Sequence, residues 1–139
     1  MSRIVKKLIS TANAARPVAP YNQAVVADRT VYVSGCIGLD KDTLTLVPGG
    51  VTQQTEVALK NLVAVLEAAG SSVDNVVKNT IFVKDLNDFG AVNEAYKKVF
   101  SKNFPARSCV QVARLPLDAL VEIESIALID MDPVQRSHL

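Results

Sequence analysis

Histidine and cysteine are scarce in this chain of 139 residues, which has one histidine, His138, and two cysteines, Cys36 and Cys109. Two isolated cysteines form neither a disulfide framework nor a Cys-x-x-Cys pair, and a single histidine argues against a Cys/His zinc site. The same scarcity excludes Ser-His-Asp and Cys-His catalytic systems. Any chemistry must therefore use carboxylates, arginine, tyrosine, amides, backbone groups and water, and the free thiols fit a reducing, intracellular compartment.

Long apolar runs and an excess of one charge are also missing. No segment approaches the roughly 18 consecutive apolar residues of a membrane span, and residues 1–15 lack the apolar stretch of a signal peptide. Lysine and arginine total 15 against 14 aspartates and glutamates, without a basic stripe, so nucleic-acid binding has no electrostatic support. With 49% hydrophobic and 21% charged residues, the composition predicts one globular domain over residues 1–139.

Hydrophobic periodicity predicts alternating strands and helices. Strands are expected at 24–26, 31–34, 76–83, 108–112 and 121–129. Helices are expected at 52–69, with Thr52 as N-cap and Gly70 after its end, and from Asn87 or Asp88 to Phe100. Residues 40–50 are expected to form a loop, and the glycine of Ser34-Gly35 indicates either a plain bulge or a close approach to the backbone.

This order of elements predicts an α+β fold with a mixed sheet, because hairpins give antiparallel neighbours and helical connections favour parallel ones. Two helices can cover one face of such a sheet. The other face carries many aliphatic residues and would be exposed in a monomer, so we expect a homo-oligomer whose sheets pack together.

Two charged residues near the C-terminal strands are the strongest candidates for chemistry. Arg107 opens an apolar run after a stiff Pro-Ala entry, and Glu122 lies inside a strand that should be half buried. Strand alternation places Glu122 and Glu124 on one face. A structural ion pair is the alternative for each of them. An arginine can clamp a carboxylate and a glutamate can activate water, so together they suggest a site where water attacks a small carboxylate.

Three further candidates have plain structural alternatives. Tyr21 follows a rigid proline and either donates its phenol to a ligand or packs half buried. Asn93 lies at the margin of the apolar face of the second predicted helix, where an ordinary surface amide is the alternative. Cys109 falls on the same strand face as Arg107, and no activating base is evident for its thiol.

Several segments together resemble the reactive intermediate deaminase family, also called the Rid or YjgF family. FPARSCVQVARLP followed by VEIESIA resembles the signature of its A-type branch. The segments APYNQAV, VSG, AAG, VKDLNDF and VNEAY agree with the family in order and spacing, so that the resemblance covers nearly the whole chain.

The resemblance implies a chorismate-mutase-like fold and a homotrimer with sites between neighbouring subunits. It implies hydrolysis of 2-imino acids, such as 2-iminobutanoate and 2-iminopropanoate, to 2-keto acids and ammonia, with no metal or organic cofactor. Arg107 would bind the substrate carboxylate and Glu122 would orient or activate water. The resemblance also assigns Tyr21 to the closing of the pocket, and Asn93, Ser34, Gly35 and the backbone of Cys109 to its lining.

Two departures from the family pattern concern substrate range. Ala19 replaces a common glycine and would stiffen the loop of Tyr21, whereas Cys36 replaces a common glutamine and is expected to place a thiol near the pocket entrance. The alternatives to a deaminase are a non-catalytic trimer that binds small carboxylates and an endoribonuclease or translation inhibitor. The tail Ser137-His138-Leu139 is similar to the Ser-Lys-Leu address, which suggests peroxisomal import beside a mainly cytoplasmic location; a solvated tail is the alternative.

Overall fold

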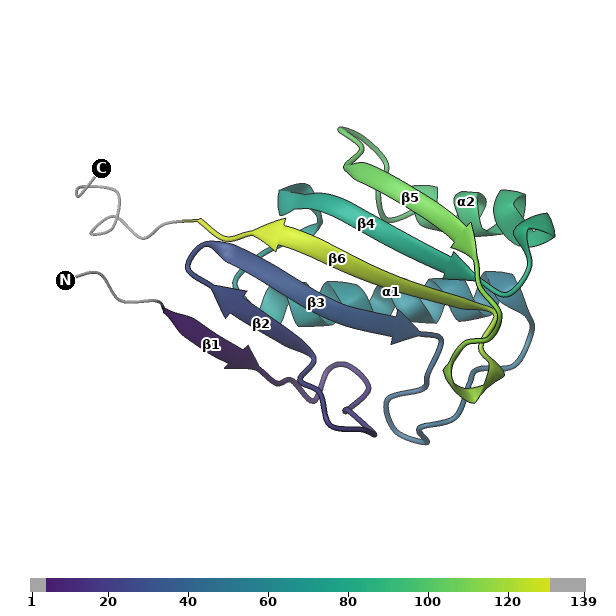
Figure 1. Cartoon of the computed structure of the whole chain (residues 1–139), viewed down its shortest axis with the longest axis horizontal. Coiled ribbons are helices and arrows are strands. Elements are labelled where there is room, and N and C mark those ends of the chain that lie inside the picture. The colour runs from purple at the N-terminus through teal and green to yellow at the C-terminus, as the bar shows by residue number, and fades with distance from the viewer. Residues whose placement is uncertain (1–4, 131–139) are drawn as a thin grey trace.

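The computed structural model describes residues 5–130 as a six-stranded mixed sheet with two α-helices packed on one face (Figure 1). The strands are β1 (Lys6–Ile9), β2 (Ala24–Ala27), β3 (Thr30–Ile37), β4 (Val76–Val83), β5 (Ala106–Gln111) and β6 (Val121–Leu128). The helices are α1 (Val51–Ala68) and α2 (Phe89–Lys97). The strand order is β1-β2-β3-β6-β4-β5, in which β4 and β5 are parallel and the other neighbours are antiparallel. The predicted mixed sheet is confirmed.

Strand β1 was not predicted from the sequence. It pairs with β2 at the edge of the sheet, and only Ile9 of its four residues is buried. Lys6, Lys7 and Leu8 are exposed, so that the alternation of buried and exposed residues by which a half-buried strand is recognised is absent. Charged residues are common on edge strands because they discourage pairing with another chain.

Helix α1 supplies the largest part of the core. The predicted apolar face is confirmed, since every member of it is buried: Ala58, Leu62, Val65, Leu66 and Ala69. The predicted start at Thr52 is wrong, because Gly50 is the N-cap, with φ of 101°, and the helix begins at Val51. Gly70 has φ of 82°, the left-handed conformation expected after the helix end.

Helix α2 is shorter than predicted and ends at Lys97 instead of Phe100. Asp88 holds the N-cap position without a side-chain hydrogen bond, and Asp85 instead accepts one from the backbone N–H of Asn87. Phe89 was expected on the inner face but is 41% exposed, because it lies at the first turn and faces the edge strand rather than the core.

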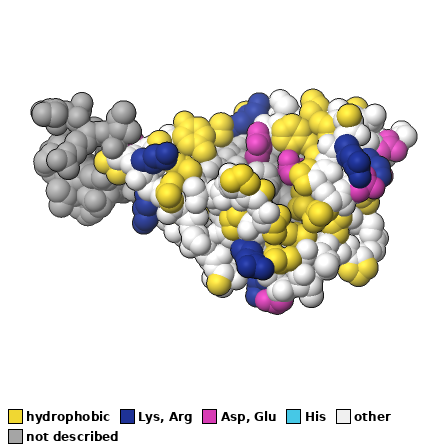
Figure 2. Space-filling view, turned by 60° about the horizontal axis from the view of Figure 1, so that its bottom comes forward, with side chains coloured by type: hydrophobic (Ala, Val, Ile, Leu, Met, Phe, Trp, Pro, Cys, Tyr) yellow, Lys and Arg dark blue, Asp and Glu magenta, His cyan; other side chains and the backbone are white. Residues whose placement is uncertain are grey.

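The helix-free face of the sheet is partly apolar. Tyr32, Val110 and Leu128 are exposed on it, in agreement with the predicted aliphatic surface. Figure 2 turns the molecule so that its lower side in Figure 1 comes forward, and hydrophobic side chains gather there around a hollow. Neither α-helix of residues 5–130 is long and apolar enough to cross a membrane. The tail Ser137-His138-Leu139 lies outside the described residues.

Candidate active site

The strand register places the two charged candidates on opposite faces of the sheet. Arg107 is the parallel partner of Asn79, which is fully buried beneath the helices, so Arg107 also points to the helix side. Glu122 alternates with Val121 and Ile123, both fully buried against the helices, so Glu122 points to the helix-free side. One chain therefore does not bring Arg107 and Glu122 into one site.

Arg107 lines a hollow of about 420 Å³, here called the arginine half-site, that opens between α2 and the start of β5. Its guanidinium carbon lies 4.9 Å from the ring centre of Tyr96 and 5.5 Å from that of Phe89. The four ion pairs found within residues 5–130 all use lysines, and none involves Arg107. The guanidinium thus rests on aromatic rings and leaves its hydrogen-bond donors available for an anion.

A buried chain of polar groups fixes the ring beneath Arg107. Ser125 Oγ donates to Asn79 Oδ1, and Asn79 Nδ2 donates to the Tyr96 hydroxyl at 2.9 Å. Tyr96 also stacks on Phe100, with 4.7 Å between ring centres. Our sequence reasoning missed Asn79 and Ser125. The sequence did carry a signal for both: each is a polar residue within a predicted strand, two positions away from residues that face the core.

Asn93 lies in the same half-site, as the resemblance implied. Its side-chain oxygen is buried and accepts no hydrogen bond from the described part of the chain. Buried acceptors are nearly always satisfied in native proteins. Asn93 thus places an amide, whose oxygen has no partner within residues 5–130, on the lining that it shares with Arg107.

The second hollow, of about 440 Å³, is here called the glutamate half-site. It unites four of the predicted residues, Tyr21, Ser34, Gly35 and Glu122. The predicted bulge explains this proximity, because the pairing of β3 with β6 shifts between Val33 and Cys36. The rest of the lining is mainly apolar and includes Val18, Ala19, Ile37, Leu39, Pro116 and Leu117.

Gly35 allows the Glu122 carboxylate to lie directly on the backbone of β3. A Cβ atom at this position would stand 2.6 Å from Glu122 Cδ and 2.8 Å from Oε1. Glycine therefore permits this close approach at the bulge, so both interpretations given for the segment, a bulge and a close approach to the backbone, apply here.

The pKa of the Glu122 carboxyl is raised above its ordinary value, first by burial and then by the negative charge of Glu124 on the same face. Burial disfavours the ionised form, and a like charge nearby disfavours it further. A carboxylate with a raised pKa accepts a proton more readily than an ordinary surface glutamate at the same pH. Glu122 thus has the environment of a general base.

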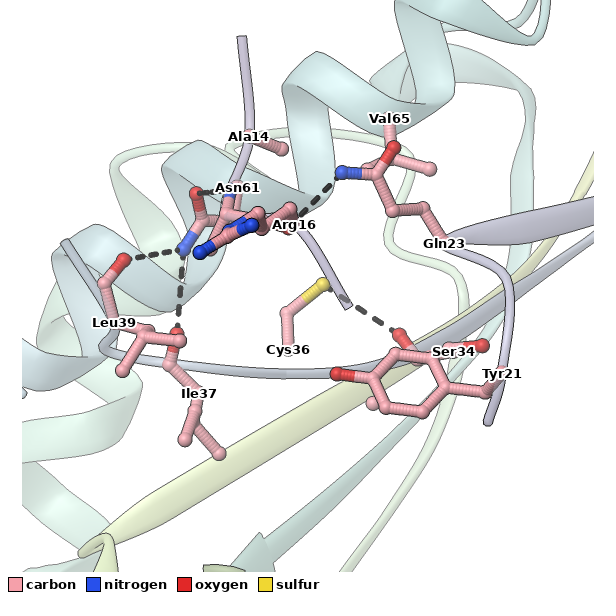
Figure 3. Close-up of a pocket in the computed structure, with 12 residues that line it drawn as sticks. Ala14, Arg16, Tyr21, Gln23, Ser34, Cys36, Ile37, Leu39, Asn61 and Val65 are labelled. Carbon is pink, nitrogen blue, oxygen red and sulfur yellow. Dashed lines mark hydrogen bonds between the residues drawn. The ribbon is translucent and has the colours of Figure 1, made fainter. Parts of the chain in front are cut away.

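Two buried amides, Asn61 and Gln23, line a small hollow next to the glutamate half-site (Figure 3). The two hollows share Tyr21, Ser34, Gly35, Ile37 and Leu39. Asn61 accepts a hydrogen bond from Ala15 N at 3.1 Å and donates to the carbonyls of Ile37 at 3.4 Å and Leu39 at 3.0 Å. Gln23 ties together the loop that carries Tyr21, with Thr11 N donating to Gln23 Oε1 at 2.7 Å. Both amides were missed from the sequence. Gln23 lies in the APYNQAV segment, where only Tyr21 was singled out, and Asn61 lies among the buried apolar residues of α1.

The side chain of Cys36 is partly buried and does not line the glutamate half-site, so the expected thiol at the pocket entrance is not confirmed. It packs against the core, lines the adjoining hollow of about 40 Å³ and points toward the Ser34 carbonyl, with the sulfur 3.5 Å from that oxygen (Figure 3). Burial, aided by the charge of Glu122, raises the pKa of Cys36 to about 12. Nucleophilic chemistry needs the thiolate, so Cys36 acts here as an apolar packing group.

Cys109 shares the strand face of Arg107 but lines neither half-site. Burial raises its pKa, against a smaller lowering by the positive charge of Arg107. The predicted contact of its backbone with ligand stays a prediction. Within residues 5–130, no group of three His, Cys, Asp or Glu side chains is placed to hold a metal ion.

Comparisons with known proteins extend over most of the chain. A family model described as Endoribonuclease L-PSP matches residues 11–129. The RutC family protein UK114 of Drosophila melanogaster is 78% identical over 128 residues, which cover 92% of this chain and 93% of that protein. A Mus musculus protein named 2-iminobutanoate/2-iminopropanoate deaminase is 52% identical, with 92% and 95% covered. The crystal structure of E. coli TdcF with bound serine matches with a TM-score of 0.85 at 42% identity, over 89% of this chain and 99% of that one.

Proposed function

This chain belongs to the endoribonuclease L-PSP family, also called YjgF or Rid, and from that premise we propose that it hydrolyses 2-imino acids to 2-keto acids and ammonia. The observation that carries the proposal is the guanidinium of Arg107, which lies on two aromatic rings and forms no ion pair within residues 5–130. Such a group recognises a small carboxylate. Relatives named 2-iminobutanoate/2-iminopropanoate deaminase support the choice of imino acid.

The proposed site forms between two copies of the chain, because Arg107 and Glu122 face opposite sides of one sheet. The arginine half-site of one copy would cover the glutamate half-site of the next. Contacts between two different patches generate a ring, and a ring of three copies is the homotrimer that we propose. The exposed apolar residues of the helix-free face would be buried in it.

In the proposed reaction, Arg107 binds the substrate carboxylate through two parallel hydrogen bonds and fixes the iminium carbon against a water held by Glu122. Glu122 removes one proton as the water oxygen bonds to that carbon. The C=N double bond becomes a single bond and gives a carbinolamine. Glu122 then returns its proton to the nitrogen, and the C–N bond breaks as the oxygen forms the C=O double bond. The hydroxyl proton passes to the departing ammonia, so that ammonium and the 2-keto acid leave. Every step uses protein groups and water.

A mixing experiment tests both the activity and the shared site. Arg107→Ala removes the carboxylate clamp and Glu122→Gln removes the base, so each purified variant should lose nearly all acceleration of 2-iminobutanoate hydrolysis. Equal amounts of the two, unfolded and refolded together, should regain activity. Random assortment in a ring of heterologous contacts returns roughly one quarter of the sites with both native residues.

Matched controls make the outcome decisive. Each variant refolded alone must stay inactive, and refolded wild type sets the full rate of keto-acid release. No recovery in a mixture that forms mixed oligomers would contradict a site shared between copies. Wild type that is folded and fails to accelerate the reaction would contradict the deaminase itself. Tight binding of 2-keto acids without hydrolysis would then favour a carboxylate-binding protein.

RNA cleavage is the second candidate, because the description of the matching family names an endoribonuclease. The sequence offers little for it, with a net charge of +1 and His138 as its single histidine. Two results together would favour RNA cleavage over deamination. The RNase activity per mole of protein would stay constant through successive purification steps, and Glu122→Gln would abolish it.

A further inference from the structure

Leu117 occupies an unusual position at the border of the glutamate half-site. It lines the same hollow as Glu122, its side chain is 59% exposed, and its backbone is left-handed, with φ of 56° and ψ of 21°. A bulky residue in this conformation is a genuine outlier, since glycine adopts it without the steric conflict of a Cβ atom. Packing within the chain does not compensate the conformation, because most of the side chain is open to solvent.

The turn that presents Leu117 is anchored on both sides. Leu115 and Ala119 are buried, and the backbone N–H of Leu120 donates to Gln54 Oε1 at 2.9 Å. Asp118 forms an ion pair with Lys84 at 3.0 Å. The backbone is thus fixed, and the isobutyl group of Leu117 is held at the rim of the hollow. Strain that the surroundings hold in place is typical of functional sites.

The hollow has a polar part and an apolar part. Glu122 and Ser34 supply polar groups, whereas Leu117, Val18 and Ile37 belong to the apolar lining. A 2-imino acid divides in the same way, into a carboxylate and imine and a hydrocarbon side chain. When Glu122 holds the attacking water near the imine carbon, the apolar lining beside it offers a surface for the side chain on that carbon.

We propose that Leu117 is a specificity-determining residue that contacts the side chain of the substrate and favours 2-imino acids with aliphatic side chains longer than methyl. The inference rests on the proposed function and deepens it. Leu117 touches no reacting atom, so its removal should weaken the recognition of long side chains and leave the hydrolysis of the smallest substrate nearly unchanged.

The test compares three substrates whose side chains are methyl, ethyl and isobutyl, made in place by an L-amino-acid oxidase from alanine, 2-aminobutyrate and leucine. Leu117→Gly removes the apolar group and suits the left-handed backbone. We expect kcat/KM for the isobutyl substrate, relative to the methyl one, to fall roughly 10-fold, the scale for losing apolar contact with a few carbons. Leu117→Asn, which also tolerates this conformation, should act in the same direction, and Leu117→Met should retain the preference.

Leu44→Gly is the matched control. Leu44 has φ of 57° and lies in the loop between β3 and α1, outside the lining of the half-site. The Leu44→Gly change relieves the same backbone conformation, and it should leave the ratio of kcat/KM for the isobutyl and methyl substrates unchanged. Melting temperature and oligomer mass are measured for every variant.

Three results would overturn the inference: an unchanged ratio in folded Leu117→Gly and Leu117→Asn, an equal loss on all three substrates, or a changed oligomer mass, which would assign Leu117 to the contact between copies. Wild type that accelerates none of the substrates would refute the proposed function separately. In that case, calorimetric binding of pyruvate and 4-methyl-2-oxopentanoate decides the inference. The inference requires that Leu117→Gly weaken the binding of 4-methyl-2-oxopentanoate and leave the binding of pyruvate nearly unchanged.

Discussion

Replacing Gly35 with alanine should separate the geometry of the site from the stability of the fold. Gly35 does not have a left-handed backbone, so alanine fits its conformation. The added Cβ would stand 2.6 Å from Glu122 Cδ, and the atom in the way belongs to the movable end of a side chain. We therefore expect the fold to remain and the Glu122 carboxylate to shift.

The size of the shift follows from ordinary contact distances. Carbon atoms pack at about 3.5–4.0 Å, so the carboxyl carbon must retreat by roughly 1 Å. A misplacement of about 1 Å can reduce the rate of a catalysed step by about 100-fold. We expect kcat for 2-iminobutanoate hydrolysis to fall by that factor, while KM changes little because Arg107 still binds the carboxylate.

Gly38→Ala is the matched contrast. Its Cβ would stand 2.6 Å from Gln54 Cα and 2.7 Å from Gln54 O, which belong to the backbone of α1 and cannot rotate away. This variant should lose stability, whereas Gly35→Ala should keep a wild-type unfolding curve.

A double-mutant cycle attributes the loss of activity to Glu122. In a Glu122→Ala background the Gly35→Ala change meets no carboxylate, so it should add no further loss. Wild-type kcat in folded Gly35→Ala would refute the reasoning, as would a full additional loss in the double variant.

Two further changes test the support and the charge of the glutamate half-site. Asn61→Ala removes three hydrogen bonds to the loop and to β3, so the free energy of unfolding should fall by about 3 kcal/mol. Urea unfolding at fixed protein concentration measures this change. A decrease of less than about 1 kcal/mol would contradict the assigned role of Asn61. Glu124→Gln removes the charge that helps to raise the pKa of Glu122, so the acid limb of kcat/KM should move to lower pH, and an unmoved limb would exclude Glu124 as a cause. A carboxyl whose pKa is raised on folding stabilises the folded state at low pH, and this contribution is lost as pH rises through the pKa. Glu124→Gln lowers the pKa of Glu122 toward its ordinary value, so it should also increase the free energy of unfolding near neutral pH.

Local periodicity was sufficient to predict most of the fold. The buried face of α1 and the alternation of Glu122 with Val121 and Ile123 follow from the helical and strand repeats, and both are confirmed. Strand β1 could not be found in this way, because an edge strand with one buried residue has no repeat. The start of α1 was misplaced because Gly50 caps the helix without a side chain, which is a weaker sequence signal than threonine.

The resemblance supplied the main residues of the candidate site, but which of them belongs to which half-site was not predicted. Tyr21, Ser34, Gly35 and Glu122 meet as expected. The resemblance implied sites between subunits, and the opposite orientations of Arg107 and Glu122 depend on pairing across three strands, which no local pattern reveals. The support of Tyr96 by Asn79 and Ser125 is likewise a contact between distant segments.

The division of charge between two half-sites bears on how Glu122 could work as a base. In the proposed assembly, Arg107 of one copy faces Glu122 of the next, and without substrate its positive charge would favour the ionised carboxylate. A bound substrate carboxylate neutralises that cation, and the iminium charge disappears as the water oxygen bonds to carbon, so burial and Glu124 again raise the pKa of Glu122. Glu122 would thus become a stronger base as the water loses its proton. A separated chain has the glutamate but no clamp in front of it, so activity should disappear on dilution below the dissociation constant of the oligomer.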